Sequence, residues 1–312
     1  MRIASALTRY AAPVIATGVL LAGCGQAPTT SSSGPDSPAS ASAPASGVPG
    51  KSAARAGAGA SGEPVAAGGQ KSLLAPLPNP ATMAPGTVYR NPANGREEVI
   101  VANISRTALL IGDSQSEPTN GWPRQGLSAA GYDVFFCGLG GTGYVAANGK
   151  TGNYVDALQR GDWKLPYGAP ALIVMEGGGN DATRGATDAQ IVANAERLIA
   201  SLKQRYPSAR LAMIGTLARG ANYGGGRRTQ VDSLLGGLAA RHSIPFISTG
   251  DWLTKYNLTS QMADGVHMNS TGHAALGTIL AGKLKDLGLE LPPPGPVTSP
   301  ATRQRYRRTG KS

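Results

Sequence analysis

TALLIGDS, at residues 107–114, is the stretch that decides the fold of this 312-residue chain. The run from Thr107 to Ile111 is short and apolar and ends at Gly112, and continuous runs of this kind suit strands that are covered on both faces, as in a parallel sheet. Glycine lets the backbone turn sharply, so Ser114 would begin the next segment with its hydroxyl exposed. The stretch therefore predicts a buried parallel strand with a serine at its carboxyl end.

Four more apolar runs follow along the chain, at residues 132–137, 171–175, 210–215 and 244–247. Helical patterns alternate with them, at residues 187–206, 228–242 and 270–287. The first of these helices would begin at Thr187-Asp188 and carry one apolar face, made of Ile191, Ala195, Leu198, Ile199 and Leu202. Alternating strands and helices predict a doubly wound α/β domain with a five-stranded parallel sheet, and in such sheets the active site lies beyond the carboxyl ends of the strands.

Polar and glycine-rich segments follow these runs, as that arrangement requires. Gly112-Asp113-Ser114-Gln115 follows the first run and offers a nucleophile, and the segment 138–143 follows the second and offers backbone N–H groups to an oxyanion. Asn180, after the third run, has an amide that can donate to the same oxyanion. Asp264 and His267 precede the last helix. His267 can act as a base, and Asp264 can supply the carboxylate that fixes the tautomer of the imidazole. Each segment alone is also ordinary turn chemistry.

In this order the segments resemble the SGNH hydrolases, also called the GDSL esterase/lipase family, over about residues 105–285. The resemblance implies a flavodoxin-like three-layer sandwich and serine chemistry that needs no metal and no cofactor. It implies Ser114 as nucleophile, His267 as general base and acid, and Asp264 as the orienting carboxylate. The implied oxyanion donors are the N–H groups of Ser114 and Gly141 and the side chain of Asn180.

Two positions depart from the family pattern. Gln115 stands in place of the leucine that gives the family its name, and we expect this change to leave the chemistry intact. No Asn precedes the glycine of the second segment, where Cys137-Gly138 stand instead. The glycine donor is therefore left open, with Gly140 and Gly143 as alternatives to Gly141.

The remaining histidines and the cysteine of this domain are expected to be structural. His242 ends one helical pattern and His273 lies within another, so both favour packing or surface positions. Cys137 is alone in its domain, so no internal disulfide is available, and we expect a small buried apolar side chain. A metal site would need clustered His, Cys or carboxylate ligands, and the sequence shows no such spacing.

The N-terminal segment indicates export and anchoring. Residues 1–23 carry Arg2 and Arg9 and an apolar run too short to span a bilayer stably, which is typical of a signal peptide. Leu21-Ala-Gly-Cys24 resembles the bacterial lipobox, in which the Cys thiol receives a diacylglycerol and anchors the protein to the membrane. The alternative is an ordinary signal peptide with an accidental Cys. We therefore expect an extracytoplasmic lipoprotein of a bacterial cell membrane.

Low-complexity sequence flanks the expected hydrolase domain. Residues 24–96 are rich in Ala, Gly, Ser and Pro, and we expect a disordered tether that carries the lipid anchor at Cys24. The hydrolase domain would span residues 97–292. A basic tail at residues 293–312 would be disordered, or would hold an anionic lipid or wall polymer.

The net charge of +11 is scattered outside this tail, and export disfavours nucleic acid as a partner. We expect a monomer. The sequence has no long apolar insertion that could form a lid, so we expect hydrolysis of short-chain acyl esters. O-acetyl groups of envelope glycans are the substrate that the location suggests, and the segment 219–228 could form a rim for such a polyol or anionic polymer. Acyl transfer from the same site and non-catalytic glycan binding are the alternatives.

Overall fold

The computed structural model describes residues 78–293, and within them five parallel strands form the central sheet. These strands are β3 (Thr107–Gly112), β4 (Asp133–Gly138), β6 (Leu172–Glu176), β7 (Arg210–Ile214) and β8 (Phe246–Ile247). Their spatial order is β4-β3-β6-β7-β8, and every neighbouring pair is parallel. Numbered along the chain, this order is the flavodoxin-like 2-1-3-4-5. The five predicted runs are all strands, and the predicted fold class is confirmed.

The inner strands are mostly apolar because both of their faces are covered. All residues of β3 are buried, and successive side chains of a strand point to opposite faces. Leu109 and Ile111 thus pack into one core cluster, while Ala108 and Leu110 pack into a second cluster on the other side of the sheet. The sheet is therefore the middle layer of a three-layer sandwich.

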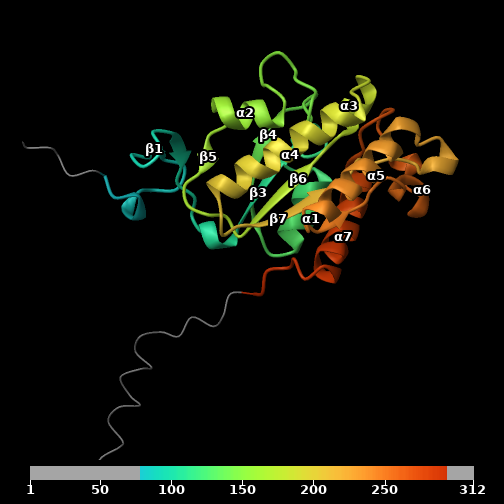
Figure 1. Ribbon diagram of the computed structural model, residues 1–312. Coiled ribbons are helices and arrows are strands. Elements are labelled where there is room, and N and C mark those ends of the chain that lie inside the picture. The colour runs from blue at the N-terminus through green and yellow to red at the C-terminus, as the bar shows by residue number, and fades with distance from the viewer. Residues whose placement is uncertain (1–77, 294–312) are drawn as a thin grey trace, which may run out of the picture. The chain divides into compact units, whose positions relative to one another are not determined.

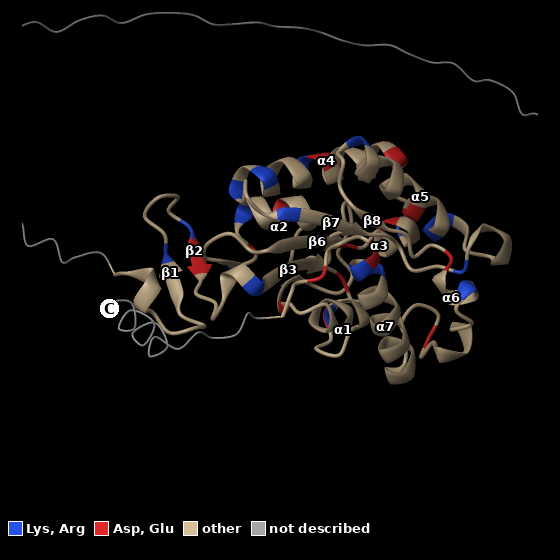
Figure 2. Cartoon of the chain, turned by 90° about the horizontal axis from the view of Figure 1, so that it is seen from below, with Lys and Arg blue, Asp and Glu red and all other residues tan. Residues whose placement is uncertain are grey.

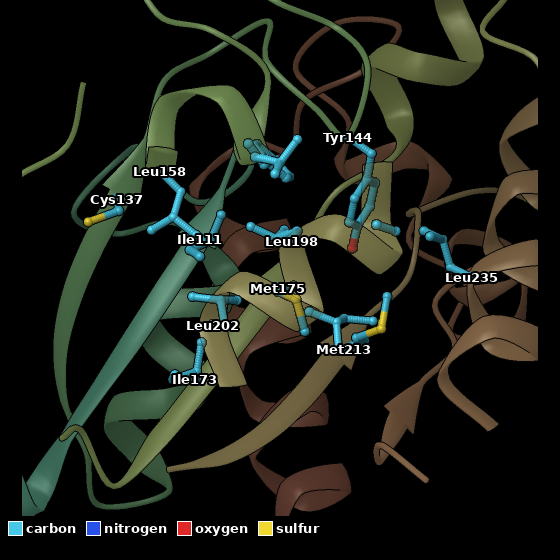
Figure 3. Close-up of a cluster of buried hydrophobic side chains, with 14 of the residues drawn as sticks. Ile111, Cys137, Tyr144, Leu158, Ile173, Met175, Leu198, Leu202, Met213 and Leu235 are labelled. Carbon is cyan, nitrogen blue, oxygen red and sulfur yellow. The ribbon is translucent and has the colours of Figure 1, made fainter. Parts of the chain in front are cut away.

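Helices α2 (Tyr154–Arg160), α4 (Asp188–Arg205) and α5 (Gly226–Arg241) cover the first face, as Figure 1 shows. The predicted apolar face of α4 is buried against the sheet, and Figure 3 shows Leu198 and Leu202 beside strand side chains such as Met175. Thr187 caps α4 in a capping box with Gln190, which satisfies backbone donors at the first turn.

Helices α1 (Trp122–Ala129) and α7 (Ser270–Asp286) cover the second face with the short helix α6 (Trp252–Lys255). Glycines let α1 and α7 approach closely, because a Cβ on Gly126 would lie 2.6 Å from Leu280 Cδ2 and one on Gly277 would lie 2.7 Å from Gln125 Cβ. Gly126 and Gly277 therefore fix how the last long helix sits on the first. Helix α3 (Gly179–Thr183) is a single short turn after β6.

The ordered part begins earlier than the sequence predicts. Residues 24–96 were expected to be disordered throughout, but η1 (Pro80–Thr82) and β1 (Val88–Arg90) are formed, and β1 pairs with β2 (Glu97–Val99) in a small sheet completed by β5 (Leu165–Pro166). Polar contacts stabilise this hairpin: the buried carboxylate of Glu98 accepts from the amides of Asn91 and Asn94 and pairs with Arg205. Amino-acid composition alone does not predict this buried cluster of polar contacts. The rest of the tether (24–77) and the tail beyond residue 293 lie outside the described residues.

The two ends of this domain differ in character. Figures 1 and 2 show the small sheet at one end and α6 at the other. Helices α4 and α5 both carry acidic and basic residues, which Figure 2 colours red and blue. None of the helices between residues 78 and 293 is long and apolar enough to cross a membrane. Short helices η2 (Ile104–Arg106), η3 (Ala221–Tyr223) and η4 (Thr259–Gln261) connect the longer elements.

Candidate active site

The candidate site lies at the carboxyl ends of β3 and β6, where the strand order reverses. Loops that leave neighbouring strands at such a point diverge to opposite faces and leave a crevice between them. Ser114 follows β3 and Asn180 follows β6, so both predicted residues start from this edge of the sheet. His267 reaches it from the loop before α7.

Three predicted side chains meet in a hydrogen-bonded chain. The Ser114 hydroxyl oxygen lies 2.9 Å from His267 Nε2, and His267 Nδ1 lies 2.8 Å from Asp264 Oδ2. A carboxylate can only accept, so Nδ1 must carry the proton of the ring and Nε2 is left to accept from the Ser114 hydroxyl. The arrangement can therefore take a proton from Ser114 as its oxygen attacks an electrophile.

Asp264 is held ionised by the loop it belongs to. Its Oδ1 accepts from the backbone N–H groups of Val266 at 2.6 Å and His267 at 2.7 Å. The hydrogen bond from the His267 ring and then these two N–H groups keep the pKa of Asp264 well below its ordinary value. One short loop thus fixes both the position of the carboxylate and the tautomer of the imidazole.

Gln115 connects the serine loop to the histidine loop. The side chain is buried, and its Nε2 donates to the carbonyl of Val266 at 2.9 Å while its Oε1 accepts from Trp122 Nε1 at 3.2 Å. Val266 directly precedes His267, so this contact positions the imidazole relative to Ser114. The sequence indicated only that Gln115 replaces a leucine, and a contact across 151 positions leaves no local signal.

Asp113, the neighbour of Ser114 in the chain, forms a partly buried contact with Asn180. Asp113 accepts from the Gln115 N–H at 2.9 Å and from Asn180 Nδ2 at 3.0 Å. Asn180 Nδ2 also donates to the carbonyl of Thr142 at 2.9 Å, so both amide hydrogens have protein acceptors. Burial raises the pKa of Asp113 to about 6. To donate to a substrate, Asn180 must release one of these two acceptors.

Within the glycine segment, Gly140 lies nearer to Ser114 than Gly141 does. A Cβ on Gly140 would lie 3.4 Å from the Cβ of Ser114, whereas one on Gly141 would face Arg184 and Asn148. Gly141 takes a positive φ of 79° and turns the chain away from the serine. Spacing along a glycine-rich segment cannot distinguish these positions, because the path of the loop decides which glycine contacts Ser114.

Asp181 is a positioning residue that the sequence left without a role. Its carboxylate accepts from three consecutive backbone N–H groups, those of Tyr144, Val145 and Ala146, at 2.8–2.9 Å. A Cβ on Gly143 would lie 2.5 Å from Asp181 Oδ2, so only glycine fits there. Asp181 therefore holds the glycine segment against the loop that carries Asn180.

A further carboxylate and a guanidinium line the cavity beside Ser114. Glu176 ends β6 fully buried, accepts from the Ser116 hydroxyl at 2.7 Å, and has a pKa raised well above its ordinary value by burial. Arg228 comes from the start of α5 and lines the same cavity of about 10 Å³. It belongs to the segment expected to form a rim. The sequence signal for Glu176 is a charged residue that directly follows the predicted run at residues 171–175.

The residues expected to be structural have such contacts. His273 Nδ1 accepts from the backbone N–H of Trp122 at 3.2 Å, and His242 is the C-terminal cap residue of α5. Cys137 is buried in the core, and burial raises the pKa of its thiol to about 12. No group of three or more His, Cys, Asp or Glu side chains suited to a metal occurs among residues 78–293. A larger cavity, of about 630 Å³, is lined by Tyr167 and Arg205 and by none of these site residues.

Comparison with solved structures finds similar folds in several esterases. A member of the lipolytic protein G-D-S-L family from Veillonella parvula is 18% identical, with a TM-score of 0.45, and the match covers 59% of this chain and 99% of that one. The lipase/acylhydrolase from Enterococcus faecalis is 21% identical, with a TM-score of 0.45, covering 58% of this chain and 96% of that one. A family two carbohydrate esterase from Clostridium thermocellum, in complex with cellohexaose, is 17% identical, with a TM-score of 0.42, covering 62% and 68%.

Among curated protein sequences none matches this chain. The model of the GDSL-like Lipase/Acylhydrolase family matches residues 105–275, which is more than half of the chain. The fold is a flavodoxin-like three-layer sandwich with a serine just after its first central strand. The chain belongs to the GDSL-like lipase/acylhydrolase family and is an ester hydrolase.

Replacing Asp181 tests its positioning role. Asp181→Ala leaves three N–H groups without their acceptor, and we expect it to lower the free energy of unfolding by about 3 kcal/mol. Urea denaturation followed by circular dichroism measures this. Asp188→Ala removes an exposed carboxylate paired with Arg227 and should cost less than about 1 kcal/mol. Equal losses in the two variants would contradict the role of Asp181.

Replacing Gln115 tests the link between the two loops. Gln115→Leu restores the residue typical of the family but removes the hydrogen bond to the Val266 carbonyl. Because His267 is then less firmly positioned against Ser114, we expect kcat for p-nitrophenyl acetate to fall about tenfold. Gln159→Leu, on the exposed face of α2, is the control and should leave kcat unchanged. An unchanged kcat in Gln115→Leu would show that the loop holds His267 without this contact.

Proposed function

We propose that this chain is a serine esterase that removes short acyl groups by a Ser-His-Asp mechanism. The observation that carries the proposal is the hydrogen-bonded chain from Ser114 through His267 to Asp264. Ser114 attacks the ester carbonyl as His267 Nε2 takes its proton. The imidazolium, stabilised by Asp264, returns the proton to the leaving alcohol, and a water activated by the same imidazole releases the acyl group.

The oxyanion formed in this reaction needs donors at the nucleophile. We assign this role to the backbone N–H groups of Ser114 and Gly140 and to the amide of Asn180, in place of the donor set with Gly141. Ser114 N–H has no protein acceptor among residues 78–293, so it is free to donate. Preorganised donors of this kind are each worth about 2.7–4 kcal/mol in the transition state.

A short acyl group fits the space beside the nucleophile. The cavity lined by Ser114, Asn180 and Leu217 is small, about 10 Å³. An acetyl methyl group matches such a space better than a long acyl chain does. With export of the protein, this supports O-acetylated envelope glycans as substrates. Transfer of the acyl group to a sugar hydroxyl would use the same site, and product analysis with and without an acceptor separates the two reactions.

Ser114→Ala tests the nucleophile. We expect kcat for p-nitrophenyl acetate to fall at least about a thousandfold with an unchanged melting temperature, because the remaining groups cannot form an acyl-enzyme. A fluorophosphonate probe should label the wild type and fail to label this variant. Ser233→Ala, on the exposed face of α5, should keep both activity and labelling. Wild-type hydrolysis by Ser114→Ala would end the proposal.

We also propose that the protein is anchored outside the cytoplasm by a lipid on Cys24. The support is the sequence Leu21-Ala-Gly-Cys24 after an apolar run with a basic start. Several acyl chains on one residue give stable anchoring, whereas a single chain holds a protein only marginally. The esterase domain would then act on the cell envelope from the membrane surface.

Metabolic labelling tests the anchor. Cells that express the full chain and are fed an alkyne analogue of palmitate should yield labelled protein in the membrane fraction. Cys24→Ser should abolish the label and release the protein from membranes. Cys137→Ala changes the other cysteine, which is buried in the core, and should keep the label. Label that persists in Cys24→Ser would refute the lipid at this position.

A further inference from the structure

An unpaired carboxylate lies beside the proposed nucleophile. Glu117 is exposed, and its Oε2 accepts from the backbone N–H of Gly140 at 2.7 Å. The position of a Cβ on Gly140 lies 2.9 Å from this carboxylate oxygen and 3.4 Å from the Cβ of Ser114. Gly140 therefore lies between the Glu117 carboxylate and Ser114. Its N–H, which we assign to the oxyanion, already donates to the Glu117 carboxylate.

The backbone around this contact is fixed on both sides. Glu117 N–H donates to the Asp113 carbonyl at 2.9 Å, and the carbonyl of Glu117 accepts from Arg124 Nη2 at 2.9 Å. On the opposite side the Gly140 carbonyl accepts from Asn148 Nδ2 at 3.1 Å. The side chain of Glu117 is thus the part that can move. Within residues 78–293 no Lys, Arg or His nitrogen lies within 4.0 Å of its carboxylate, so no ion pair retains it.

This contact opposes the reaction of a simple ester. Two negative oxygens cannot share the Gly140 N–H, because like charges at such a distance repel and a hydrogen-bond donor has one hydrogen. The side-chain amide of Asn180, another proposed donor, also donates to protein acceptors, namely Asp113 and the Thr142 carbonyl. Before the oxyanion forms, the Glu117 carboxylate must give up its hydrogen bond to Gly140 and accept from another donor or from water.

We propose that Glu117 is a specificity-determining residue that selects esters with a free hydroxyl beside the acyl group. This rests on the proposed function of Ser114. The substrate hydroxyl donates to the Glu117 carboxylate, draws it away from Gly140 and frees the N–H for the oxyanion. Simple alkyl and aryl esters lack that donor, so they react more slowly because the Gly140 N–H remains hydrogen-bonded to Glu117. The substrate class is therefore acyl esters of polyols and sugars, in which a hydroxyl neighbours the esterified oxygen.

A matched pair of esters tests this selection. 2-Hydroxyethyl acetate and 2-methoxyethyl acetate differ in one position, where a methyl group replaces the hydroxyl hydrogen that would be donated to Glu117. We expect wild-type kcat/KM to favour the hydroxyl ester about tenfold, the scale of one hydrogen bond to a charged group. Glu117→Ala should bring the ratio close to one, by raising kcat/KM for the methoxy ester and lowering it for the hydroxyl ester. Glu117→Gln, which keeps the size of the side chain but not the charge, should reduce the ratio in the same direction.

Glu97→Gln is the matched control. Glu97 is an exposed carboxylate of the small sheet, paired with Lys164, and its loss removes the same charge away from the site, so the ratio should remain that of the wild type. A wild-type ratio near one, or a ratio that Glu117→Ala leaves unchanged, would overturn the inference. So would an equal fall for both esters, which would indicate a structural role. Fluorophosphonate labelling of Ser114 separates the two proposals: a labelled enzyme with a flat ratio refutes only the role of Glu117, whereas an unlabelled wild type refutes the serine mechanism itself.

Discussion

The carboxylate of Asp113 is the group on which the geometry of the site depends. It joins the end of β3 to the loop after β6, because one oxygen accepts from the Gln115 N–H and the other from the Asn180 amide. Burial makes this contact costly when Asp113 is ionised, and Glu176 adds a second buried carboxylate nearby. The half-buried guanidinium of Arg228 offsets their charge from the start of α5. Segments from three elements thus act as one rigid support for Ser114.

Much of the fold was predictable because its signals are local. Continuous apolar runs predicted all five strands of the main sheet, and the polar residues just past them gave Ser114 and Asn180. The Asp264–His267 pair was also visible, because three residues of one loop fix its geometry. The hairpin of β1 and β2 was missed because polar contacts around Glu98, rather than apolar runs, stabilise it.

The details of the site could not be predicted because they depend on how distant loops meet. Gln115 looked like a neutral replacement until the fold brought Val266 to its amide. The choice between Gly140 and Gly141 depends on the path of one loop, and the contact of Glu117 with Gly140 joins loops from two different strands. Spacing along the chain predicts which residue types reach the site, whereas packing decides which atoms touch.

The close packing of α1 on α7 has a consequence for biosynthesis. Helix α7 and the loop that carries His267 come from the end of the described domain, and Gly126 and Gly277 hold them against a helix made far earlier. A nascent chain that has emerged only as far as β8 holds the serine but lacks the imidazole. The contact between Ser114 and His267 can therefore form only after almost the whole domain has been synthesised.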